Sequence, residues 1–144
     1  MKQLERLTIE ERELLFSAPV LLSVLACCTN NEVNKVQKAD AIKMAHLKTF
    51  TADPLLIPFY MEVEKQFQER FELAVRQYKP FDDAGRQALR EKISQIHFIL
   101  GKLDKSYANI LDKSFEKYER HVKKADHTVL QDFIFPVPMR GLND

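Results

Sequence analysis

The residues best suited to metal chemistry in this chain are its four histidines, and their spacing is unfavourable. No two of them lie four residues apart, so no helix would present a ready pair of histidine ligands on one face. The closest approach to a site is His121, Asp126 and His127, near the end of a predicted helix. His121 also suits a helix C-terminus, where positive charge is favoured. These three residues are weak candidates for a metal site, and we predict no cofactor.

Motifs for catalysis are missing from the sequence. It contains no Walker loop, dinucleotide fingerprint, CxxC pair, HExxH or GxSxG nucleophile turn. Helical bundles can hold two iron ions through Glu-x-x-His pairs, but no glutamate here is followed three residues later by histidine. We therefore predict no catalytic residues and a protein that is not an enzyme.

The two cysteines, Cys27 and Cys28, are adjacent. Neighbouring cysteines can be joined only through a strained ring, so we expect reduced, buried thiols. The segment Met1–Arg6 is not a signal peptide, because no apolar core follows a basic end. The longest apolar run, 18–28, is shorter than the roughly 20 residues of a membrane span. These features predict a cytoplasmic protein with no membrane partner.

Charge does not favour nucleic acid as a partner, since 22 basic residues meet 21 acidic ones. Residues 102–124 hold seven basic and four acidic side chains, which is an excess of three. However, acids and bases alternate there, as in Glu116, Lys117, Glu119 and Arg120. This pattern is typical of a solvated helix face with ion pairs four residues apart. We predict no nucleic-acid partner.

Helical signals follow one another along the whole sequence. Thr8 and Glu11 form a capping box, and Pro19 places a helix boundary near Ser17. We expect further helices over 19–28, over 33–50, in one long stretch to Tyr78, over 83–100 and over 104–125. No segment alternates as a strand would, so we predict no sheet. The fold class is all-α: a compact bundle of six to seven helices forming a single domain over 1–144.

The C-terminal segment 133–139 is apolar but contains two prolines. A dangling end would be polar, so we expect an extended tail that lies across the body. Alternatively, its apolar side chains could cover a protein partner or a second copy of the chain.

The stretch Ala26–Gln37 (ACCTNNEVNKVQ) resembles the helix junction of TerB-like proteins, the tellurite-resistance family. In that family an apolar helix runs into A-D-G-x-I-D-x-x-E and then into a second helix. The resemblance implies an all-helical fold with two pseudo-repeated halves, and it implies that those acids bind divalent cations. A second turn of this kind would fall at 124–129, where only Asp126 remains of the acids.

The acids of the family motif are replaced here by the amides Asn30, Asn34 and Gln37. Amides bring no negative charge, and hard divalent cations depend on carboxylates, so the resemblance implies a degenerate site without tight metal binding. The amides could instead hydrogen-bond helix ends, or Asn30 could belong to a plain polar turn. A calcium-binding EF-hand is excluded, because Lys35 stands where glycine is required and Ala41 where glutamate is required.

Two functions follow as expectations. The first is a non-enzymatic, stress-associated or protein-interaction module that binds a protein partner or a second copy of itself. The alternative is a divalent-metal-binding protein whose weak or relocated site lies near Asp126 and His127. A rise in melting temperature with a divalent ion would distinguish the second from the first, because a ligand that binds only the folded state stabilises it.

Overall fold

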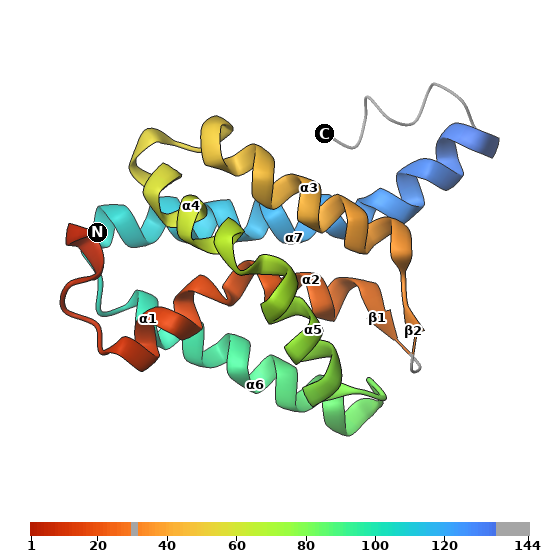
Figure 1. Cartoon of the computed structure of the whole chain (residues 1–144), viewed down its shortest axis with the longest axis horizontal. Helices are drawn as coiled ribbons and strands as arrows, with labels where there is room; N and C mark the ends of the chain where they lie inside the picture. The colour runs from red at the N-terminus through yellow and green to blue at the C-terminus, as the bar shows by residue number, and fades with distance from the viewer. Residues whose placement is uncertain (30–31, 135–144) are drawn as a thin grey trace.

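Seven α-helices form a bundle around one of their number, the buried helix α2, in the computed structural model, which describes residues 1–29 and 32–134, with side chains up to residue 124. Figure 1 shows the arrangement. In chain order the elements are η1 (Lys2–Leu4), α1 (Ile9–Phe16), α2 (Ala18–Cys27), β1 (Cys28–Thr29), β2 (Glu32–Val33), α3 (Lys35–Thr51), η2 (Pro54–Leu56), α4 (Ile57–Lys65), α5 (Phe67–Tyr78), α6 (Asp83–Leu100) and α7 (Lys105–Ile134). The predicted all-α class is confirmed.

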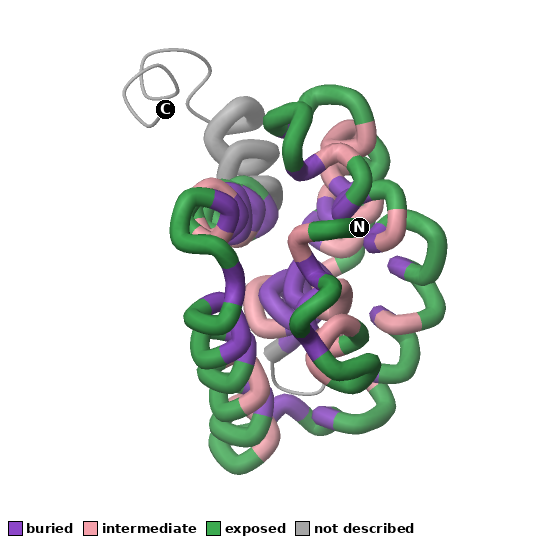
Figure 2. The backbone as a smooth tube through the Cα atoms, turned by 90° about the vertical axis from the view of Figure 1, so that its left-hand side faces the viewer, coloured by how far each residue is buried: buried purple, intermediate pink, exposed green. Residues whose placement is uncertain are grey.

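Helix α2 lies at the centre because it is apolar on nearly every side. It packs against α3, α5, α6 and α7, and Figure 2 shows buried residues at the centre of the molecule. Pro19 lies in its first turn, where the missing N–H costs nothing. Its one hydroxyl residue, Ser23, is fully buried and donates to the carbonyl of Pro19 at 2.6 Å. This is the buried core helix that the apolar run predicted.

Short-range signals set several helix ends as predicted. Thr8 and Glu11 form the reciprocal capping box at the start of α1. Asp82 accepts a hydrogen bond from the backbone N–H of Gly85 at 2.8 Å and begins α6. Asp104 accepts more weakly, at 3.3 Å, from the N–H of Tyr107 in the first turn of α7. A side-chain acceptor at each N-cap satisfies a backbone donor that has no partner within the helix.

The single long helix expected up to Tyr78 is wrong, because the chain breaks at Gln66 into α4 and α5. The apolar residues that recur every three or four positions in this stretch are nevertheless buried in both α4 and α5. The break redirects the chain, so that α4 packs on α3 and α1 while α5 packs on α2. The spacing of the apolar residues predicted which side chains are buried. It did not predict the break, because an interruption of one residue hardly changes that spacing.

The expectation of no strands is also wrong locally, because β1 and β2 pair antiparallel with Cys28 opposite Val33 and Thr29 opposite Glu32. Strands of two residues are too short to produce the alternation that predicts a sheet.

Helix α7 continues nine residues beyond the expected end at Ala125, to Ile134. The next proline is Pro136, so no proline interrupts the chain between Ala125 and Ile134. Phe133 and Ile134 are therefore helical and not part of an extended tail, while 135–139 lie outside the described residues. Nowhere in the described chain is a helix both long and apolar enough to span a membrane.

Candidate functional site

Asn34, one of the amides in the degenerate motif, caps a helix. Its side-chain oxygen accepts a hydrogen bond from the backbone N–H of Gln37 at 2.9 Å and so begins α3. Its own N–H donates to the carbonyl of Cys27 at the end of α2, at 2.7 Å. Asn34 thus joins the end of α2 to the start of α3. Asn30 lies outside the described residues.

The side chain of Gln37 crosses to another helix. Its amide nitrogen donates to the backbone carbonyl of Lys123 in α7 at 3.1 Å, and the residue is only 9% exposed. A donor is required at this position, because a carbonyl oxygen can only accept. A carboxylate at residue 37 would place two acceptors against each other.

The candidate metal residue His121 faces Asp40 of α3. Its Nε2 lies 3.0 Å from a carboxylate oxygen of Asp40, which is an ion pair when the imidazole is protonated. Asp126 and His127 lie in the part of α7 whose side chains are not described. Among the side chains that are described, no group of three or more His, Cys, Asp or Glu residues could hold a metal ion. A metal site near Asp126 and His127 stays a prediction.

The adjacent thiols of Cys27 and Cys28 are free and buried, as predicted. Their sulfur atoms lie 3.6 Å apart. A hydrogen bond from the Cys28 thiol lowers the pKa of Cys27, and the same contact, together with burial, raises the pKa of Cys28. Arg86 closes this end of α2 by donating to the carbonyl of Cys28 at 2.7 Å. Because both residues are almost fully buried, these thiols are not placed to meet a substrate.

One face of α7, here called the sealed face, is packed against α2, α3 and α4. It consists of Tyr107, Leu111, Ser114, Phe115, Tyr118 and Val122, all buried. Two hydrogen bonds fasten it: Ser114 to the hydroxyl of Tyr60 at 2.5 Å, and the Tyr118 hydroxyl to the carbonyl of Ala41. Burial raises the pKa of both Tyr60 and Tyr118 above the ordinary tyrosine value, so both hydroxyls keep their protons into the alkaline range. This face is structural.

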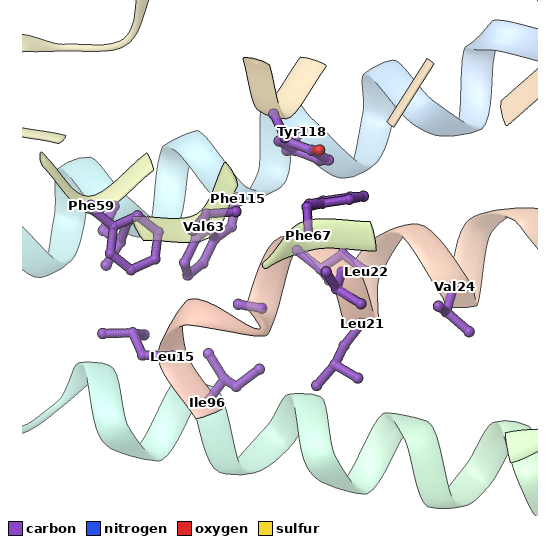
Figure 3. Close-up of a cluster of buried hydrophobic side chains, with 14 of the residues drawn as sticks. Leu15, Leu21, Leu22, Val24, Phe59, Val63, Phe67, Ile96, Phe115 and Tyr118 are labelled. Atoms are coloured by element: carbon purple, nitrogen blue, oxygen red, sulfur yellow. The ribbon is translucent and has the colours of Figure 1, made fainter. Parts of the chain in front are cut away.

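The neighbouring face of α7 borders a groove. Helices α6 and α7 both pack on α2 but make little contact with each other, so α2 forms the floor between them (Figure 1). A cavity of about 120 Å³ lies there, lined by Ala18 and Leu22 of α2, by Ile93, Ile96 and His97 of α6, and by Asp112, Phe115, Glu116 and Glu119 of α7. Figure 3 shows Leu22, Ile96 and Phe115 between these three helices. We call this feature the α6–α7 groove.

The groove continues toward the start of α7. A second, more open cavity of about 400 Å³ is lined by Leu100, Gly101, Leu103, Lys105, Ala108 and Asn109. It shares His97 and Asp112 with the first cavity, and Nδ1 of His97 lies 3.8 Å from a carboxylate oxygen of Asp112. The two cavities are therefore neighbours along α7, separated by the contact between His97 and Asp112.

The charges of the groove are one-sided. The described lining of the first cavity includes three carboxylates, Asp112, Glu116 and Glu119, but no lysine or arginine. The three lie on α7 at spacings of four and three residues, so they share one face. Glu119 also pairs with Lys123 at 3.6 Å, outside the lining. The cavity thus combines an apolar floor with an acidic wall.

Sequence reasoning missed this groove because acidic and basic residues of 102–124 were expected to neutralise each other on a solvated face. In three dimensions the signs separate, since Asp112, Glu116 and Glu119 form one row and Lys113, Lys117 and Arg120 form the next. Plotting charge by helical face, and not along the sequence, would have shown the acidic row. The apolar floor contributed by α2 and α6 depends on tertiary packing and has no short-range signal.

Comparisons with known proteins add no relative. No protein-family model, curated protein or solved structure matches the chain. The resemblance to TerB-like proteins stays a prediction. Among the described residues, the α6–α7 groove is the candidate binding site.

Proposed function

We propose that this protein is a non-enzymatic protein-interaction module that binds a segment of a partner protein in the α6–α7 groove. The observation that supports the proposal is the cavity of about 120 Å³ between α6 and α7, whose lining from α2 and α6 is apolar and includes the half-buried side chain of Ile93. Grooves of this kind bind amphipathic segments of partner proteins, because apolar anchors leave water when they enter the cavity. A role in stress, which the TerB-like resemblance implies, is part of this proposal only as a prediction.

The shape and lining of the groove support binding over chemistry. Five lining side chains of the first cavity are apolar: Ala18, Leu22, Ile93, Ile96 and Phe115. The ionisable residues lie on α7 and at His97, along the edges of this floor. Binding sites combine a mostly apolar surface with a few polar groups that fix the orientation of the ligand. Asn34 and Gln37 of the degenerate motif do not line the groove; both are engaged at the start of α3.

A displayed library of random 16-residue peptides tests the proposal. We expect selection against the purified chain to enrich peptides that bind in the groove. Replacement of a floor residue, Ile93→Glu, should weaken their binding at least tenfold, because it places a charge among apolar anchors. The control is Phe98→Glu on α6, since Phe98 is 73% exposed and lies outside both cavities.

Circular dichroism melting should show that both variants remain folded before binding is compared. Enriched peptides that bind the wild-type chain and the Ile93→Glu variant equally would contradict the proposed site. A selection that enriches no groove-dependent peptide would contradict the proposed function itself.

A further inference from the structure

We infer that the partner segment is a basic amphipathic helix of about four turns, whose apolar side lies on the groove floor and whose lysines or arginines face the acidic wall of α7. This inference rests on the proposed function and specifies the partner's chemistry. Its basis is the complementarity between such a helix and the groove, which has an apolar floor and an acidic wall.

The acidic wall favours a cationic partner. Asp112 and Glu116 are four residues apart, and Glu116 and Glu119 are three apart, so like charges are neighbours on one helix face. Such neighbours destabilise a helix in isolation. Within the described side chains, Glu116 forms no ion pair, and the contact of Asp112 with His97 is long at 3.8 Å. A row of cations laid along this wall would therefore remove repulsion and add attraction.

The groove has the length of a short helix. It extends along α7 from Lys105 to Glu119, which are fourteen residues apart. At 1.5 Å per residue this is ~21 Å, or about four helical turns. Leu100 and Leu103 in the second cavity continue the apolar lining, which is mostly buried, so the apolar contacts of the partner would centre on the half-buried Ile93 and on the cavity beside it. A helix whose apolar residues recur every three or four positions would contact this floor on one side only.

The ends of the groove differ in charge. Glu116 and Glu119 lie at one end, and Lys105 lies at the other. The basic residues of the partner therefore belong toward the middle of α7, and a basic residue beside Lys105 would be repelled. Because the two ends of the groove carry opposite charges, the partner helix should bind in one orientation. Attraction from net charge alone would not fix that orientation.

Two synthetic 15-residue peptides test the inference. Both carry the same leucines at helical spacing, and their polar face is either lysine and arginine or glutamate. Fluorescence anisotropy at low salt should show the basic peptide binding at least tenfold tighter than the acidic one, and added salt should reduce the difference. In the variant with Asp112→Lys, Glu116→Lys and Glu119→Lys, we expect the preference to reverse.

A matched variant separates the local wall from the overall charge. Glu10→Lys, Glu69→Lys and Glu91→Lys change the net charge equally on residues outside both cavities, so the preference for the basic peptide should persist. Equal loss in both triple variants would overturn the inference. Equal binding of both peptides, still abolished by Ile93→Glu, would overturn the charge preference but retain the proposed function. A dimer that neither peptide dissociates would assign the groove to a second copy and also overturn the inference.

Discussion

The sealed face of α7 packs against α2, α3 and α4, whereas the face next to it borders the groove toward α6, and Phe115 lies at the edge shared by both. On the sealed face, the hydroxyls of Ser114 and Tyr118 have partners from other helices, Ser114 with Tyr60 and Tyr118 with Ala41. On the groove face, the carboxylates of Asp112, Glu116 and Glu119 line the cavity shared with α2 and α6. One helix thus contributes both to the core and to a candidate binding surface.

The difference shows how a small helical protein can separate stability from recognition. Buried groups with satisfied hydrogen bonds hold the fold, and their loss is costly because no water replaces the partner. The carboxylates on the neighbouring face are half-buried or exposed, so they contribute less to folding, and Glu116, which is exposed, remains available to a ligand. Substitutions on the sealed face should therefore change stability, and substitutions in the groove should change binding.

The largest expected effect is the loss of an aromatic ring of α4 that packs against the sealed face. Phe59 is fully buried and lies 5.8 Å from Phe115 between ring centres. Phe59→Ala should lower the free energy of unfolding by about 3–5 kcal/mol, because it leaves a cavity. Ile93→Ala, on the half-buried groove floor, should cost roughly 1–2 kcal/mol. Urea denaturation measures both, and equal losses would contradict the distinction between the two faces.

A smaller effect tests the amide motif. Gln37→Glu places a carboxylate against the carbonyl of Lys123 and should cost about 1–3 kcal/mol at pH 7. A protonated carboxyl can donate to that carbonyl, so the folded state should raise the pKa of the introduced group. The loss is therefore present above the folded pKa and shrinks as the pH falls below it.

Asn34→Asp is the matched control for this change, since an aspartate oxygen can still accept from the N–H of residue 37. We expect its unfolding free energy to stay near that of the wild-type chain. A Gln37→Glu penalty that did not change with pH would show that the contact with Lys123 is not its cause.

Two tyrosines of the sealed face give the next comparison. The Tyr118 hydroxyl donates to Ala41, whereas the Tyr107 hydroxyl is buried without a hydrogen-bond partner among the described residues. Tyr118→Phe should cost about 1–2 kcal/mol, because the carbonyl of Ala41 loses its donor. Tyr107→Phe should change the unfolding free energy little or raise it. The reverse order in chemical denaturation would refute this assignment of hydroxyl roles.

Alkaline pH gives the smallest effect. Burial raises the pKa of Tyr107 to about 12. Because the unfolded tyrosine ionises near pH 10, the unfolded state releases this proton first, and the stability falls as the pH rises from about 10 to 12. The loss from this residue should be roughly 1 kcal/mol or less at pH 10.5. Tyr107→Phe should make the decline shallower, and an unchanged decline would assign it to other groups.

Much of the fold was predictable because its signals are local. Thr8, Asp82 and Asp104 lie at helix starts, and the apolar run 18–28 contains the central helix. The break at Gln66 and the pairing of Cys28 with Val33 were not predictable, since each depends on where distant helices lie. Their local sequence signals are weak.

For the amide motif, the sequence indicated which side chains could form hydrogen bonds but not the partners they bond. It suggested that amides such as Asn34 and Gln37 could bond helix ends, yet the choice of Lys123 as partner required α7 to lie beside α3. The groove has no local signal, because Leu22, Ile93 and Phe115 are widely separated in the chain. The regular spacing of these apolar residues predicted that they are buried. It did not predict that a gap would remain between α6 and α7.

Methyl NMR with labelled isoleucine and leucine tests the central claim most directly. Titration with the basic amphipathic peptide should produce saturable shifts at Leu22, Ile93 and Ile96, which line the groove. Leu56, which is buried elsewhere in the core, and Leu55, which is exposed near the start of α4, should stay unchanged. Shifts confined to Leu55 and its neighbours, with Ile93 unmoved, would contradict the account.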